Sequence, residues 1–286
     1  MSFLLIFFST VTNLAEGLLI KRYNSKHQKG GFIFTAFISM FSMLFFLLTD
    51  RDGFLIPTQL WWYAAIAGLL YCGASFLTYV ALQIGSFAIS MLILSYSIVI
   101  SIGYGLFFLK EETSIFAIVG IGLMLISVYL SYSPKKQTEE KKGSFLWLIC
   151  ILASALGSGL FGVVQRMQQI RFENACTNEF MVISLAISSL VLFAIGIGKE
   201  PSDLPYVLRN GVHWCAAAGV SNGLTNAMVV CLHTLMPISL SSPIRVSSKI
   251  LLSFLLSLAV FREKFSKKQI AGVLMGTLAL LLLNLK

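Results

Sequence analysis

Residues 238–261 read ISLSSPIRVSSKILLSFLLSLAVF, a long apolar stretch with a polar segment in its first half. If the stretch is helical, each residue turns by about 100°, and the polar side chains gather on about one third of the circumference. This polar face consists of Ser241, Ser242, Arg245, Ser248 and Lys249. The stretch therefore predicts a long apolar helix with one polar face.

The two cations on this face would be costly inside a bilayer. Near the midplane each unpaired charge costs about 2.5–3.5 kcal/mol, so Arg245 and Lys249 must face protein, water or a ligand. Pro243 adds to the cost, because it has no N–H for the carbonyl of Ser239. Two interpretations stay open: the cations bind a substrate, or they are structural and neutralised by a buried partner.

The composition excludes an ordinary soluble protein. Apolar residues make up 57% of the chain and charged residues 12%, against about 25% charged residues in soluble proteins. The formal charge of +9 comes from Lys and Arg residues in short loops. This distribution is typical of membrane topology and does not indicate nucleic-acid binding. The first apolar run ends in Lys21-Arg22, so we expect a first membrane span and no cleaved signal peptide.

The hydropathy pattern predicts an all-α integral membrane protein with ten transmembrane helices, since a spanning helix needs about 20 mostly apolar residues. The candidate spans are residues 3–20, 32–48, 61–82, 87–109, 115–132, 145–164, 180–197, 212–235, 238–261 and 270–285. The polar segment 133–143 lies at the centre of the chain and is expected to link two halves.

The two halves resemble each other. Residues 110–114, KEETS, correspond to residues 262–266, REKFS, at an offset of 152. Further matches are Gly68 with Gly219 at an offset of 151, and Ser9, Gly17 and Lys21 with Ser154, Gly162 and Arg166 at an offset of 145. Because five spans per half is an odd number, residues 1–132 and 144–286 would cross the membrane in opposite senses, as an inverted-topology repeat.

This duplicated unit resembles a known transporter family. In each copy the fourth span ends in a basic and acidic loop, FLKEE at 108–112 and VFRE at 260–263, and a Gly-containing span closes the unit. These features are similar to the EamA-type branch of the drug/metabolite transporter superfamily over essentially the whole chain. The resemblance implies a ten-helix transporter with a central cavity between the halves. Leu14-Ala15-Glu16 also resembles the first-helix motif of the small multidrug resistance proteins, which implies a coupling carboxylate at Glu16.

Glu16 is the only acidic residue well inside a predicted span. A desolvated carboxyl exchanges protons near neutral pH, which suits proton coupling. Alternatively, Glu16 pairs permanently with Arg245 or Lys249 and only fixes the helices.

Polar side chains also follow one face of the third and eighth spans. Asn222 and Asn226 are one turn apart, and Tyr71 and Ser75 occupy the same places in the other copy, with Tyr79 on the same face. Such residues either line a cavity or form hydrogen bonds between helices.

Together these features predict a secondary active transporter that moves a small anionic or zwitterionic metabolite across the plasma membrane. The expected partners are this small-molecule substrate, the lipid bilayer and protons. The sequence contains no phosphate-binding Gly-rich loop and no catalytic or metal-binding motif, so we expect neither an enzyme nor a cofactor. A cation exporter that uses Glu16, and a passive channel or accessory subunit, stay as alternatives.

The Lys and Arg residues also predict an orientation. The odd-numbered loops carry 14 of these residues, and the even-numbered loops with the C-terminal tail carry five. The positive-inside bias therefore places the odd loops in the cytoplasm and both termini outside.

Overall fold

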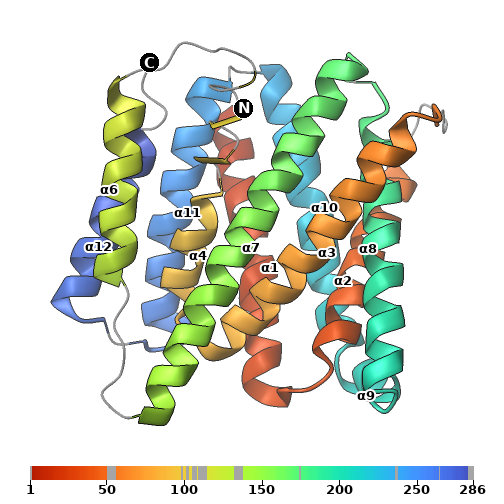
Figure 1. Ribbon diagram of the computed structural model, residues 1–286, viewed down its shortest axis with the longest axis horizontal. Helices are drawn as coiled ribbons and strands as arrows, with labels where there is room; N and C mark the ends of the chain where they lie inside the picture. The colour runs from red at the N-terminus through yellow and green to blue at the C-terminus, as the bar shows by residue number, and fades with distance from the viewer. Residues whose placement is uncertain are drawn as a thin grey trace.

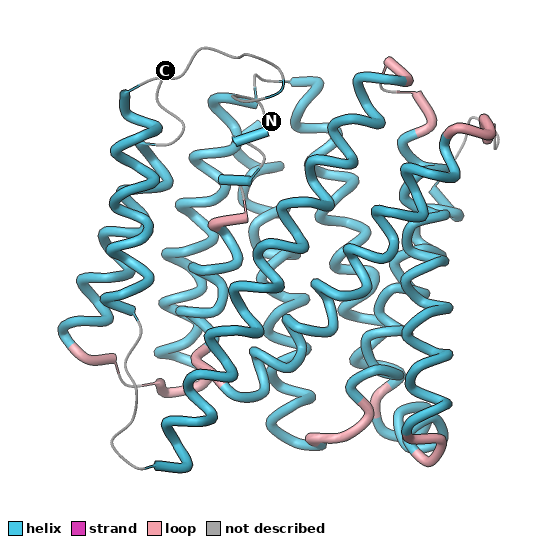
Figure 2. The backbone as a smooth tube through the Cα atoms, in the orientation of Figure 1, coloured by secondary structure: helices cyan, strands magenta, loops and turns pink. Residues whose placement is uncertain are grey.

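The computed structural model describes residues 2–49, 56–97, 99–100, 103–104, 108, 115–131, 138–173, 175–235, 238–263 and 265–282. Within these residues the chain consists of helices and short connections, without a strand (Figure 2). The helices are α1 (Ser2–His27), α2 (Gly31–Thr49), α3 (Leu60–Ile84), α4 (Phe87–Ser95), α6 (Ile115–Ser131), α7 (Thr138–Arg171), α8 (Thr177–Lys199), α9 (Asp203–Asn210), α10 (Val212–Leu235), α11 (Ile238–Val260) and α12 (Lys267–Leu282).

Successive long helices run in opposite directions between two ends of the molecule (Figure 1). The connections α1–α2, α3–α4, α8–α10 and α11–α12 lie at the lower end of Figure 1, and the start of α1 and the end of α12 lie at the upper end. The Lys- and Arg-rich loops 21–29 and 262–268 thus share one end of the molecule.

Five helical segments of the described residues are long and apolar enough to cross a membrane. They are Leu4–His27, Gly31–Thr49, Leu60–Ile84, Phe145–Arg171 and Thr177–Lys199, and the shorter apolar segments are Val119–Ser131 and Ser248–Val260. With the apolar composition, these segments define a multi-pass membrane protein.

The helix pairings recur when the two halves are exchanged. α3 packs on α7 as α10 packs on α1, and α3 packs on α8 as α10 packs on α2. The pairs α2–α8, α4–α11 and α6–α12 each join one helix from either half. Apolar side chains of both halves fill the interior, around Tyr23, Phe34 and Cys215 and around Leu92, Ile151 and Leu280.

Two glycines at equivalent positions of the two halves make equivalent contacts with the opposite half. A Cβ on Gly68 would lie 2.7 Å from the carbonyl oxygen of Ser184 on α8, and one on Gly219 would lie 2.7 Å from that of Ile38 on α2. Each glycine therefore allows close backbone contact with the opposite half.

The structure differs from the predicted helices at several places. The fourth span was expected as one helix to residue 109, but α4 ends at Ser95. After a turn at Tyr96 and Ser97, the described residues 99–100, 103–104 and 108 are helical again. α9 is an additional short helix, which was missed because its eight residues are not apolar enough for a span. α7 begins at Thr138, inside the expected linker. In contrast, α11 continues through Pro243 to Val260, as the sequence predicted.

Candidate functional site

Glu16 lies on α1 and makes its hydrogen bonds with α10. The side-chain nitrogen of Asn222 lies 3.1 Å from Oε1 of Glu16 and 3.0 Å from Oε2, and donates to both. A carboxylate accepts at both oxygens, so the amide group matches the ionised form of Glu16. The contact joins the first half of the chain to the second.

Two further donors fix the direction of the Asn222 amide. Its Oδ1 accepts a hydrogen bond from Ser42 Oγ at 2.8 Å and another from Asn226 Nδ2 at 3.2 Å. Both donors meet the oxygen, so the amide NH2 group points to Glu16. Glu16 is thereby linked through the Asn222 amide to Ser42 on α2 and to Asn226 on α10.

Arg245 and Lys249 lie one turn apart on α11. In the part of the chain that the structure describes, the only ion pair is Lys21–Glu263. Lys249 interacts electrostatically with Glu16, but no described carboxylate lies within ion-pairing distance of either cation. Within the described residues, Lys249 therefore faces Glu16 at more than ion-pairing distance, and Arg245 forms no ion pair.

Two cavities lie between the halves. The Glu16 cavity has a volume of about 220 Å³, and the Arg245 cavity has a volume of about 380 Å³. The residues that line both are Asn13, Leu94, Ser97, Ser158 and Lys249. The cavities therefore adjoin, and together they offer room for a small metabolite.

Most of the predicted site residues line these cavities. Those on the Glu16 cavity are Glu16, Tyr71, Ser75, Tyr79, Asn222 and Lys249. Arg245, Asn226 and Lys249 line the Arg245 cavity. Ser248 lines neither cavity, and the side chain of Ser241 lies outside the described part of the structure.

The sequence interpretation missed several lining residues, of which Asn13 and Ser158 are the clearest. The two are equivalent at the offset of 145 and line both cavities. The repeat itself was the signal that could have found them, because Asn13 lies one turn before Gly17 and Ser158 one turn before Gly162. Gln165, on the same face of α7 as Ser158, was also missed.

The end of α4 lies beside both cavities. Beyond Ser95 the backbone changes to tighter bonds: Tyr96 N donates to Ile93 O at 3.0 Å, and Ser97 N donates to Leu94 O at 3.2 Å. These are i to i+3 bonds, which interrupt the regular α-helical ladder. Ser97, in this turn, lines both cavities. Discontinuous helices of this kind are typical of substrate sites in transporters.

Antiparallel apolar helices with a polar cavity between two similar halves are the architecture expected of a membrane transporter of small molecules. The sequence model of the EamA-like transporter family matches residues 1–133 and 145–285. The chain therefore belongs to the EamA-like transporter family.

Two further comparisons describe how the chain relates to other proteins. Comparison with curated proteins gives no match. A solved structure, titled only "Crystal structure of protein", is similar over 97% of this chain and 96% of its own length. Its TM-score is 0.62 at 17% sequence identity, so it supports the fold alone.

Proposed function

We propose that this chain is a secondary transporter that moves a small anionic or zwitterionic metabolite across the plasma membrane by alternating access. The observation that carries this proposal is the pair of cations, Arg245 and Lys249, on a cavity between the halves, without an ion-pair partner among the described residues. An anionic substrate group would supply the missing counter-charge, and a guanidinium can grip a carboxylate or phosphate with two parallel bonds.

Alternating access requires two units that move against each other. The helix pairings that recur on exchange of the halves support ten membrane helices arranged as an inverted repeat of residues 1–132 and 144–286. The cavities lie where these units meet, so a relative rotation would change the end from which a substrate enters.

Glu16 is the proposed proton site. The ionised carboxylate accepts both hydrogen bonds from Asn222. A proton on Glu16 converts one acceptor into a donor, which faces the donating NH2 group of Asn222. Because Ser42 and Asn226 hold that amide from the other side, protonation would weaken the α1–α10 contact rather than simply turn the amide around.

The test begins with a thermal-shift screen of small metabolites on purified protein. Compounds that raise the melting temperature are then followed in proteoliposomes for accumulation against a gradient, with and without an uncoupler. Arg245→Ala should remove the thermal shift, whereas the matched control Ser248→Ala, on the same helix but on neither cavity, should keep it. Equilibration without accumulation would indicate a channel, and thermal shifts only with organic cations would indicate a cation exporter.

The orientation is tested separately. The proposal places the linker 133–143 in the cytoplasm, so a cysteine at Ser133 should resist an impermeant maleimide added to intact cells. A cysteine at Thr58, an exposed position between α2 and α3 at the other end, should react as the control. Labelling at Ser133 and protection at Thr58 would reverse the orientation.

A further inference from the structure

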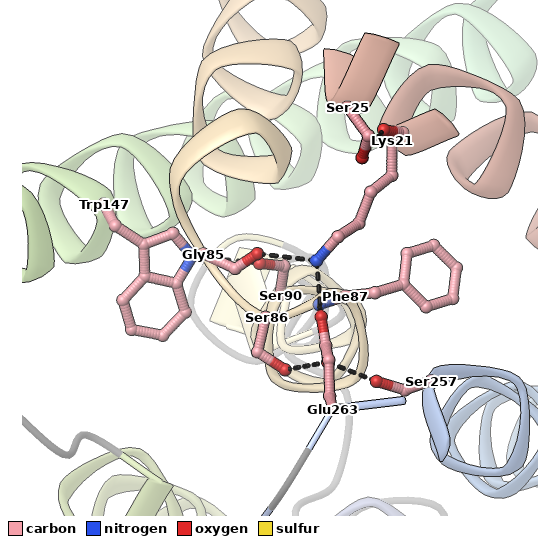
Figure 3. Close-up of polar contacts among 9 residues, drawn as sticks. All are labelled: Lys21, Ser25, Gly85, Ser86, Phe87, Ser90, Trp147, Ser257 and Glu263. Atoms are coloured by element: carbon pink, nitrogen blue, oxygen red, sulfur yellow. Dashed lines mark hydrogen bonds and ion pairs between the residues drawn. The ribbon is translucent and has the colours of Figure 1, made fainter. Parts of the chain in front are cut away.

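A buried ion pair lies at the lower end of the helix bundle, away from the proposed substrate cations. Lys21, near the end of α1, lies with its Nζ 2.5 Å from Glu263 Oε1. The same ammonium donates to the carbonyl oxygen of Gly85 at 2.8 Å. The side chains of Lys21 and Glu263 are 12% and 16% exposed, so both charges are largely withdrawn from water. Figure 3 shows the two side chains meeting between α1, the start of α4 and the end of α11.

The remaining donors around Glu263 come from two other places. Ser86 Oγ donates to Oε2 at 2.6 Å, the backbone N–H of Phe87 donates to Oε1 at 3.0 Å, and Ser257 Oγ donates to Oε2. The carboxylate thus caps the N-terminus of α4, where a negative charge is favoured. Burial alone would raise the pKa of Glu263, but Lys21 and the hydroxyl donors outweigh it and hold that pKa below its usual range.

An apolar layer lies between this ion pair and the Glu16 cavity. Gly17 lines the cavity, and the side chains of Met91 and Phe87 fill the space where its Cβ would be. The rings of Phe87 and Phe261 lie 5.4 Å apart, and Lys21 Nζ lies 5.0 Å from the centre of the Phe261 ring. Rings and ion pair therefore form consecutive layers below the cavity.

The ion pair joins helices of opposite halves. Lys21, Ser86 and Phe87 belong to the first half, and Ser257 and Glu263 belong to the second. At the equivalent position of the second half, Arg166 is exposed and makes no ion pair with any described residue. Glu111, the counterpart of Glu263 at the offset of 152, lies outside the described residues.

We propose that the Lys21–Glu263 pair is the gate of the transport path at the lower end, which holds α1 and α4 against α11 and must separate before the Glu16 cavity opens there. This inference rests on the proposed alternating-access function. The gate has two states. In the closed state the two charges pair with each other, and the carboxylate also caps the N-terminus of α4. In the open state each charge is solvated by water that enters the path.

If the ion pair is a gate, weakening it should make the Glu16 cavity more accessible from the lower end. A reporter cysteine replaces Ser75, which lines that cavity, in a protein whose Cys231 is replaced by serine. An impermeant methanethiosulfonate is added to membrane vesicles with the α1–α2 loop facing the bath. Glu263→Gln should raise the labelling rate about tenfold or more, because an unpaired buried Lys21 disfavours the closed state. The matched control Arg262→Gln, an exposed charge in the same loop, should stay within about twofold of the parent.

The double variant Lys21→Met/Glu263→Gln decides whether the two residues act as a pair. It should label no faster than Glu263→Gln, because the interaction is already lost in the single variant. If Glu263→Gln does not fold, Ser257→Ala takes its place, with both charges kept and a smaller increase expected. Labelling at the control rate in every folded variant would overturn the gate. The labelling rate can be measured whether or not the chain transports a substrate. A chain that transports nothing would contradict the proposed function, and the labelling rates would still decide whether the ion pair is a gate.

Discussion

The contact between Glu16 and Asn222 has a counterpart at the equivalent positions of the repeat, between Phe161 and Tyr71. The positions correspond at offsets of 145 and 151, and each contact joins equivalent helices, α1 to α10 and α7 to α3. One contact is a carboxylate bonded to an amide at 3.0 Å; the other is a pair of aromatic rings with centroids 5.5 Å apart. The equivalent helices α7 and α3 thus pack together without an acid at this position, which favours a functional role for Glu16 over a purely structural one.

The same asymmetry holds on α11 and α4. Lys249 corresponds to Ser97, and Arg245 corresponds to the buried Ile93, at the offset of 152. Asn13 with Ser158 and Ser75 with Asn226 are instead polar in both halves, and all four line the cavities. The duplicated frame supplies a polar cavity from both sides, whereas its two cations come from the second copy and its carboxylate comes from the first. A substrate with different ends needs such an arrangement.

The largest effect is expected at the acid. Glu16→Gln should abolish uncoupler-sensitive accumulation in proteoliposomes while downhill exchange continues, because the glutamine cannot take up and release a proton. The equivalent change in the other half, Phe161→Leu, should leave accumulation intact.

If Glu16 is instead a structural partner, Glu16→Gln should lower the melting temperature by leaving a buried cation without its counter-charge. Unchanged driven accumulation in this variant would remove Glu16 from the mechanism.

A smaller effect is expected from exchanging the two cations. A guanidinium binds a carboxylate or phosphate with two bonds, whereas an ammonium acts as a point charge. Arg245→Lys should therefore weaken binding of the compound found by thermal shift more than Lys249→Arg does, by calorimetric titration. Equal losses would mean that neither residue uses planar geometry.

The smallest effect concerns the shared frame. Gly68→Ala and Gly219→Ala each place a Cβ 2.7 Å from a backbone oxygen of the opposite half, so each should cost about 1–3 kcal/mol of stability and lower the melting temperature similarly. Gly73→Ala on α3, with no atom within 4 Å of the added Cβ, is the matched control. A loss at only one of the two glycines would break the symmetry.

Much of the arrangement of the cavity-lining residues was predictable from the sequence, because it follows from the helical period and from the repeat of the two halves. Helical spacing placed Tyr71, Ser75, Asn222 and Asn226 on single faces, and these residues do line the cavities. The free-energy cost of placing a charge inside a membrane identified Arg245 as a candidate. The roles of these residues stay predictions, since their geometry shows where they lie and not what they bind.

The rest depended on contacts between distant residues. Glu263 looked like part of a loop motif, and nothing in its neighbourhood predicted the ion pair with Lys21, which lies 242 residues away. The interruption of the fourth span after Ser95 was hidden as well, because residues 87–109 are uniformly apolar enough for one span. Ser42 gave no signal, since a serine in an apolar helix bonds its own backbone as readily as a distant amide.

One measurement tests the central claim most directly: that Arg245 binds the negative group of the substrate. The affinity of the compound found by thermal shift, and of an analogue with its acidic group neutralised, is measured for the parent and for Arg245→Ala. Relative to the parent, the Arg245→Ala protein should bind the charged compound more weakly by about 1.5–3 kcal/mol. In the Arg245→Ala protein, neutralising the acidic group should cause little further loss. A full additional loss would contradict the account, because the acidic group would then be bound elsewhere.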